Sequence, residues 1–133
     1  MASVHKEFTV EAPAERVWAA LADFQAVHKR LAVGFVTDSK ADGENARVVT
    51  FANGSSAREI LVDSDAKHKR LVYAVVGSEQ IKHHNASAQI VADGPNRCRF
   101  VWTADFLPNA LAPYLDAQMQ AGSEAMKRAL EAK

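Results

Sequence analysis

The segment 109–131 constrains the fold more than any other part of the sequence. It is rich in alanine, has no β-branched residue, and has one proline, close to its start. Its apolar or small residues recur at the spacing of one helical face, at Leu111, Leu115, Met119, Gly122 and Met126, with Tyr114, Gln118 and Ala125 beside them. At ~1.5 Å per residue this helix is roughly 34 Å long, which is enough to cross a whole sheet.

The middle of the chain has the pattern of an antiparallel sheet. Short β-branched and aromatic runs alternate with turn sequences such as DGEN, NGSS and DGPN. Asp-Gly and Asn-Gly between apolar runs favour hairpins. We therefore predict a first strand over residues 4–10 and six further strands over residues 33–39, 46–51, 57–63, 70–76, 82–92 and 97–106.

The segment between the first predicted strand and the second has the pattern of short helices. Pro13 suits a first helical position, where its missing N–H costs nothing. The apolar residues that follow recur with a helical period, at Val17, Trp18, Leu21 and Phe24. Asp23 can cap a second short helix, so we predict two short helices. One continuous helix over residues 14–31 is the alternative.

A single antiparallel sheet of seven strands needs a cover on one face. Only the C-terminal helix is large enough to provide it. A curved sheet wrapped around one helix closes badly at its ends, and the space that remains is a cavity. We predict that the two short helices bridge the edges of the sheet and shut one end of that cavity.

Composition limits the function. The chain has 133 residues, so we predict one domain over residues 1–133. Sixteen Lys and Arg balance sixteen Asp and Glu, and the absence of a basic excess argues against nucleic acid as a partner. The start of the chain has no apolar stretch of signal-peptide length, and no apolar run approaches ~18 residues. We expect a cytoplasmic protein without a membrane span.

No metal or nucleophile motif stands out. His83 and His84 are adjacent in a predicted strand, so their side chains point to opposite faces and cannot chelate one ion together. Cys98 alternates with Phe100 and Trp102 on one strand face, and we interpret it as a small core residue. We predict no metal, no cofactor and no disulfide.

Three stretches carry a resemblance to a known family: VEAPAERVWAALADF at residues 10–24, RLVYAVV at 70–76 and RFVWTADFLP at 99–108. With the element order, they resemble the START-like superfamily, also called SRPBCC, and its polyketide cyclase/dehydrase-like branch. The resemblance covers nearly the whole chain. It implies an α+β helix-grip fold, in which a seven-stranded antiparallel sheet curves around a long C-terminal helix and two short helices follow the first strand. It also implies an internal apolar pocket for a small hydrophobic or amphipathic molecule, although this scaffold hosts many functions.

The predicted pocket takes its residues from the concave face of the sheet and from the long helix. The facing of strand 82–92 is open: apolarity places Ala86, Ala88 and Ile90 inward, whereas the resemblance favours the alternate residues. We follow the resemblance, although a shift of one residue inverts the face. The predicted ligand-binding residues are Phe35, Phe51, Glu59, Tyr73, His83, Asn85, Trp102, Tyr114, Gln118 and Met119.

Three functions remain open. The leading hypothesis is a binding protein for a lipid, a polyketide-like molecule or an aromatic molecule. The alternative is a cyclase-, dehydratase- or hydrolase-type enzyme in which Glu59 and His83 act as acid and base. Pairing of Glu59 with Arg47 or Arg58 would instead make that carboxylate structural. The third hypothesis is a protein-interaction domain like the co-chaperone relatives of the superfamily, and a homodimer would explain an apolar outer sheet face more simply.

Overall fold

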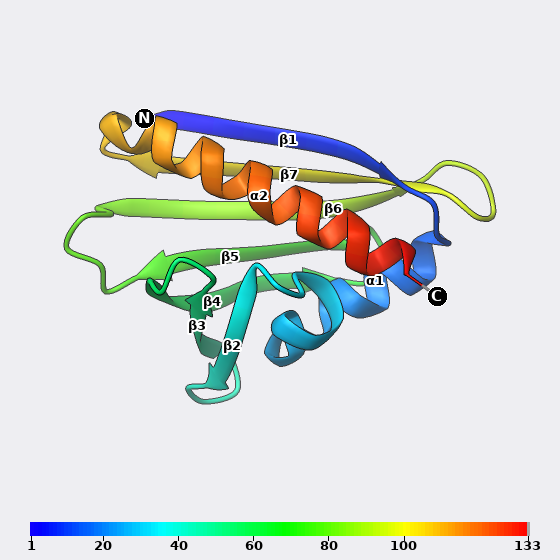
Figure 1. Ribbon diagram of the computed structural model, residues 1–133, viewed down its shortest axis with the longest axis horizontal. Helices are drawn as coiled ribbons and strands as arrows, with labels where there is room; N and C mark the ends of the chain where they lie inside the picture. Colours follow the sequence, from blue (N-terminus) through cyan, green and yellow to red (C-terminus); the bar gives the residue numbers. More distant parts are fainter. Residues whose placement is uncertain (133) are drawn as a thin grey trace.

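The computed structural model describes residues 1–132 and shows a seven-stranded antiparallel sheet with a long helix lying across it (Figure 1). The strands are β1 (Ala2–Val10), β2 (Val36–Ala41), β3 (Ala46–Phe51), β4 (Ser56–Asp65), β5 (Arg70–Val76), β6 (His83–Ala92) and β7 (Cys98–Leu107). The helical elements are α1 (Ala14–Ala22), η1 (Phe24–Ala26), η2 (Val27–Leu31), η3 (Asn109–Leu111) and α2 (Ala112–Glu131).

The strand order is β1-β7-β6-β5-β4-β3-β2. From β2 to β7 each strand therefore pairs with its neighbour in sequence, as tight turns require. The first strand pairs with the last, and the chain crosses from one sheet edge to the other through α1, η1 and η2. The predicted α+β helix-grip architecture is confirmed.

The register of the strands defines a concave face that looks toward α2. Phe100 on β7 lies opposite Ile90 on β6 and Phe8 on β1, and directly opposed residues share a face. The rings of Phe8 and Phe100 stack with their centroids 4.9 Å apart. Alternate residues of β7 from Cys98 to Phe106 point inward with Phe100, as the sequence predicted.

Helix α2 crosses the concave face from the edge strand β1 toward α1 (Figure 1). Its first turn, η3, is a 3₁₀ turn, and Pro113 stands in the first turn of the α-helix proper. At Gly122 the helix comes so close to the sheet that a Cβ atom would lie 3.2 Å from the rings of Phe35 and Trp102. Within residues 1–132, no helix combines the length and the apolar character needed to cross a membrane.

Three short segments, rather than one helix, close the end of the sheet. The continuous-helix alternative is wrong, because α1 ends at Ala22 and is followed by the 3₁₀ turn η1 and the π-helical turn η2. Asp23 caps no helix with its side chain; its carboxylate instead accepts a 3.0 Å hydrogen bond from Arg30. The buried side chains of these segments join the main core: Val17, Trp18, Leu21, Phe24, Val27 and Leu31.

The strand predicted over residues 33–39 begins later than expected. β2 starts at Val36, because Gly34 has a φ of 87° and forms a turn before it. That left-handed conformation suits glycine and interrupts an extended strand. Because the strand starts at Val36, Phe35 lies just before it. The Phe35 and Phe51 ring centroids are 5.3 Å apart.

Candidate functional site

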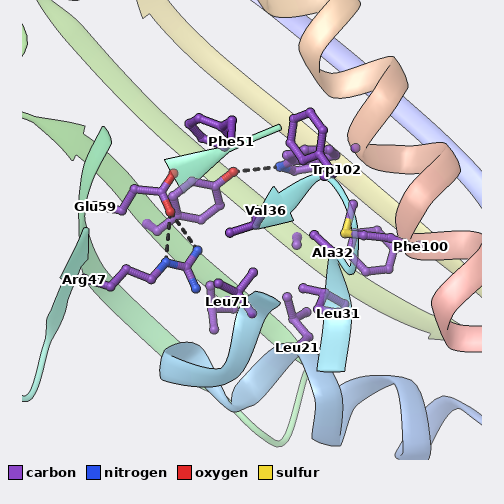
Figure 2. Close-up of a pocket in the computed structure, with 16 residues that line it drawn as sticks. Leu21, Leu31, Ala32, Val36, Arg47, Phe51, Glu59, Leu71, Phe100 and Trp102 are labelled. Carbon is purple, nitrogen blue, oxygen red and sulfur yellow. Dashed lines mark hydrogen bonds and ion pairs between the residues drawn. The ribbon is translucent and has the colours of Figure 1, made fainter. Parts of the chain in front are cut away.

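Two adjoining chambers lie between the concave face of the sheet and α2. The inner chamber has a volume of about 60 Å³ and the outer chamber a volume of about 410 Å³. Both are lined by the same five side chains at their junction: Phe35, Phe51, Glu59, Tyr73 and Trp102. Figure 2 shows the residues around the inner chamber, with Phe51 and Trp102 on one side and Leu21 and Leu31 on another.

The inner chamber is mostly apolar, and its polar lining residues are Arg47, Glu59 and Tyr73. The short helical segments contribute Leu21, Val27 and Leu31, which close its far end. Its floor and roof come from the sheet and from α2, with Leu71, Ala88, Phe100, Gly122 and Met126 among the lining residues. Most of these side chains belong to the main hydrophobic core, so the chamber is a small gap in that core.

The outer chamber opens between the start of α2 and two sheet connections. The turn between β3 and β4 contributes Ser55, and the connection between β5 and β6 contributes Ser78, Gln80 and Ile81. The helical side supplies Leu111, Tyr114, Leu115, Gln118 and Met119. The chamber therefore has polar loop groups at its edge, and Glu59 and Tyr73 lie at its inner end, where it meets the inner chamber.

Arg47 and Glu59 form a buried ion pair at the junction. They stand directly opposite each other on β3 and β4, and their exposed fractions are 7% and 6%. Nε and Nη2 of Arg47 lie 2.9 and 2.8 Å from Oε1 of Glu59. Nη1 donates to the carbonyl oxygen of Phe24 at 2.6 Å, and the guanidinium carbon lies 3.8 Å from the Phe24 ring centroid. The pair thus ties the helical closure to the sheet.

Tyr73 and Trp102 meet above the strand that separates them. Nε1 of Trp102 donates a 3.1 Å hydrogen bond to the Tyr73 hydroxyl, drawn as a dashed line in Figure 2. On β6, between their strands, Ala86 lies opposite Tyr73 and Ala88 lies opposite Trp102. These alanines leave the space in which the two aromatic side chains meet. Burial, and then the negative charge of Glu59, raises the pKa of Tyr73 above its ordinary value, so its hydroxyl is neutral.

His84 faces the outer chamber from β6. Regular pairing of β5 with β6 stops at Tyr73 and Ala86, and beyond that point Nδ1 of His84 accepts a 3.1 Å hydrogen bond from the backbone N–H of Val75. The neutral imidazole therefore carries its proton on Nε2. Burial, reinforced by the neighbouring His83, lowers the pKa of His84 to about 4.

Tyr114 stands at the edge of the outer chamber and is 49% exposed. Its hydroxyl accepts a 2.7 Å hydrogen bond from Nε2 of Gln118, one turn along α2. Burial raises the pKa of Tyr114, but hydrogen bonding by Gln118, Ser55 and Asn53 outweighs it and leaves the pKa below its usual value. Tyr114 therefore lies next to the β3–β4 turn, across the chamber entrance.

Most of the residues predicted to bind a ligand line the outer chamber: Phe35, Phe51, Glu59, Tyr73, Trp102, Tyr114, Gln118 and Met119. The predicted facing of β6 is wrong. His83 and Asn85 lie opposite Leu107 and Asp105 and point to the convex face, whereas His84, Ala86 and Ala88 point inward. The concave face must be apolar where it meets the core, and the alternation of alanines on this strand was the signal for that facing.

The predicted acid–base pair of Glu59 and His83 is therefore absent, because the two side chains lie on opposite faces of the sheet. Sequence reasoning also missed His84 and the loop residues at the entrance, such as Ser78 and Ile81. No sequence signal marks those loop residues. Among residues 1–132, no three His, Cys, Asp or Glu side chains gather closely enough to hold a metal ion.

The family model described as polyketide cyclase / dehydrase and lipid transport matches residues 1–131. The comparison with curated protein sequences finds no match. Among solved structures, the chain is similar to the protein XoxI of Bacillus cereus, with 17% identity, a TM-score of 0.85, and coverage of 98% of this chain and 96% of that one.

Two further structures share the fold. Truncated norcoclaurine synthase from Thalictrum flavum has 17% identity and a TM-score of 0.75, with 99% of this chain and 95% of that chain covered. A START superfamily protein from Mycobacterium smegmatis has 13% identity and a TM-score of 0.75, with 97% and 94% covered. These likenesses confirm the START-like helix-grip fold.

Proposed function

Since the chain belongs to the polyketide cyclase / dehydrase and lipid transport family, we propose that it binds a small hydrophobic or amphipathic molecule between its sheet and α2. The outer chamber carries this proposal. Its volume of about 410 Å³ lies toward the lower end of the roughly 300–1,000 Å³ typical of small-molecule sites. Its lining combines aromatic and aliphatic side chains with a few polar groups, which is the usual composition of such sites.

The size of the chamber favours a compact ligand. The inner chamber adds only about 60 Å³, and the rings of Phe35 and Trp102, which line both chambers, lie close to Gly122. A molecule of two or three fused or linked rings, polyketide-like or aromatic, fits this space better than a lipid with two long chains. The predicted residues that line the outer chamber, from Phe35 to Met119, are the proposed ligand contacts.

A fluorescent probe tests the proposal. N-phenyl-1-naphthylamine is uncharged and brightens in apolar surroundings, so titration into the protein should give a saturable signal. Ala57 lines the outer chamber from β4, and Ala57→Leu should weaken probe binding by about tenfold or more because the larger side chain takes its space. Ala74 pairs with Ile60 on the opposite sheet face, and Ala74→Leu is the matched control.

The control should bind the probe as the wild type does. Absence of a saturable signal with the wild-type protein would contradict the proposal. Equal binding by Ala57→Leu, Ala74→Leu and the wild type would place the probe elsewhere on the surface, and this also counts against the outer chamber. Circular dichroism on all three proteins establishes that each variant is folded.

A further inference from the structure

We propose, on the basis of the proposed ligand-binding function, that the bound molecule carries a neutral hydroxyl group, which donates a hydrogen bond to Glu59 and accepts one from Tyr73. This names the polar end of the ligand and places it at the junction of the two chambers. The apolar body of the molecule then extends into the outer chamber.

The acceptor is the second carboxylate oxygen of Glu59. Both contacts from Arg47 go to Oε1, and no group within residues 1–132 donates a hydrogen bond to Oε2. In Figure 2 this oxygen points away from Arg47, toward the side of the chamber where Phe51 lies. An unoccupied carboxylate oxygen that borders the chamber can accept a hydrogen bond, and a ligand O–H can supply it.

The donor is the hydroxyl of Tyr73. Its oxygen already accepts the indole N–H of Trp102 at 3.1 Å, which fixes its position. Its own proton is donated to no group in the described part of the chain. A hydroxyl can donate and accept at once, so Tyr73 remains able to donate to a ligand oxygen.

Strand geometry brings the two groups to one place. Glu59 lies opposite Val75, and Tyr73 precedes Val75 by two residues on the same face of β5. Such diagonal neighbours are roughly 7–8 Å apart, within reach of long side chains. A single oxygen atom lying between them can donate to one side chain and accept from the other. A methyl ether at the same point could accept but not donate.

Charge selects against an ionised ligand head. Arg47 and Glu59 are both buried and neutralise each other. A carboxylate added beside them would leave one uncompensated negative charge in the chamber, and an ammonium would leave one positive charge, each at a high desolvation cost. A phenol or alcohol adds no charge and satisfies both open positions.

Matched naphthalene probes test this inference on the wild-type protein through displacement of N-phenyl-1-naphthylamine. The set is naphthalene, 2-naphthol, 2-methoxynaphthalene, 2-naphthoate and 2-naphthylmethylammonium. We expect 2-naphthol to bind about tenfold more tightly than naphthalene, since a hydrogen bond to a charged group contributes on that scale. The methyl ether should lose most of this gain, and the two ions should bind more weakly than naphthalene.

Two variants assign the effect to the named atoms. Glu59→Gln and Tyr73→Phe should each reduce the ratio of 2-naphthol affinity to naphthalene affinity severalfold. Asp63→Asn, an exposed carboxylate on the same strand, should retain the full preference. If Glu59→Gln fails to fold because Arg47 loses its partner, Tyr73→Phe and the wild-type probe series still decide the question.

The outcomes separate this inference from the function on which it rests. If N-phenyl-1-naphthylamine itself does not bind, the proposed function fails. If that probe binds but 2-naphthol, naphthalene and the methyl ether compete equally, or none competes, the hydroxyl inference is overturned and the chamber remains a binding site. Tightest binding by either ion overturns it as well, because the Arg47–Glu59 pair would then not act as a neutral unit.

Discussion

The indole Nε1 of Trp102 donates a 3.1 Å hydrogen bond to the hydroxyl of Tyr73, although β6 runs between their two strands. The bond exists because β6 presents only Ala86 and Ala88 beneath the two rings. Two large aromatic residues thus span a strip of small ones. The same strip of alanines leaves room for the chambers above the sheet.

Replacement of Tyr73 by Phe should destabilise the protein by about 1–2 kcal/mol, because the indole N–H of Trp102 then lacks its partner in a part-buried position. Urea unfolding at neutral pH measures the change. Tyr114→Phe is the matched control: its hydroxyl lies at the exposed chamber edge, and its effect should stay within about 0.5 kcal/mol. Equal losses for both variants would contradict the role given to the Tyr73–Trp102 bond.

Ala88→Leu should push Tyr73 and Trp102 apart and fill the inner chamber, which Ala88 lines. Overpacking of this kind costs about 1–3 kcal/mol, and urea unfolding should show that loss. Ala74→Leu, on the convex face of the adjacent strand, should have a smaller effect. A gain in stability for Ala88→Leu would mean that the chamber is spare volume that a leucine can occupy without moving the rings.

Removal of one partner from the buried Arg47–Glu59 pair should be much worse than removal of both. Arg47→Met leaves Glu59 buried without its cation and should cost about 3–5 kcal/mol. The double variant Arg47→Met, Glu59→Leu should recover most of that loss. Arg58→Met breaks an exposed pair, in which Nε lies 2.7 Å from Asp42, and should cost less than about 1 kcal/mol.

This series is also measured by urea unfolding. If the double variant is no more stable than Arg47→Met alone, the dominant loss is the contact of Arg47 with the Phe24 carbonyl and ring, and charge burial is secondary. If Arg47→Met and Arg58→Met behave alike, the buried position of the first pair confers no special sensitivity.

Acidification should weaken the fold through His84. Its pKa is about 4 in the folded protein against 6.5 ordinarily, so between these values the unfolded chain binds more protons than the folded one. The stabilising contribution is therefore complete above pH 6.5, falls as the pH drops, and is lost at about pH 4. Between these two pH values, the His84 contribution to the free energy of unfolding falls by about 3 kcal/mol.

His84→Asn isolates this effect, because the Asn amide oxygen can replace Nδ1 as acceptor for the Val75 N–H but does not titrate. Between pH 7 and pH 4, the free energy of unfolding of the wild type should fall more steeply than that of the variant. His5→Asn replaces an exposed histidine on β1 and is the comparison variant. Parallel curves for wild type and His84→Asn would refute the assignment.

Much of the fold follows from local pattern. The spacing of Leu115, Met119 and Met126 predicted the long helix, and the turn sequences predicted the antiparallel strands; both are confirmed. The inward facing of Trp102 and Phe106 was predicted because β7 alternates clearly between apolar and polar residues. Where one strand face is plainly apolar, the sequence contains enough information to assign it.

The candidate site was less accessible to sequence reasoning. On β6 each alanine is next in sequence to polar residues, so neither face of the strand is plainly apolar. The prediction placed His83 and Asn85 inward, whereas the structure places His84 and Ala86 inward. The pairing of Glu59 with Arg47 depended on the register between β3 and β4, whereas Arg58 follows the alternation of β4 and lies on the other face. Local pattern does not specify which residues of two strands stand opposite each other.

The sequence by itself therefore determined the order of the elements, the length of the helix that covers the sheet, and the family to which the chain belongs. Only the tertiary structure decided which oxygen of Glu59 meets Arg47 and that Tyr73 reaches Trp102 across Ala86 and Ala88. The physical reason is the separation along the sequence over which each effect acts. Periodicity acts between residues close in sequence, whereas a chamber and its hydrogen bonds depend on register, sheet curvature and packing between residues distant in sequence.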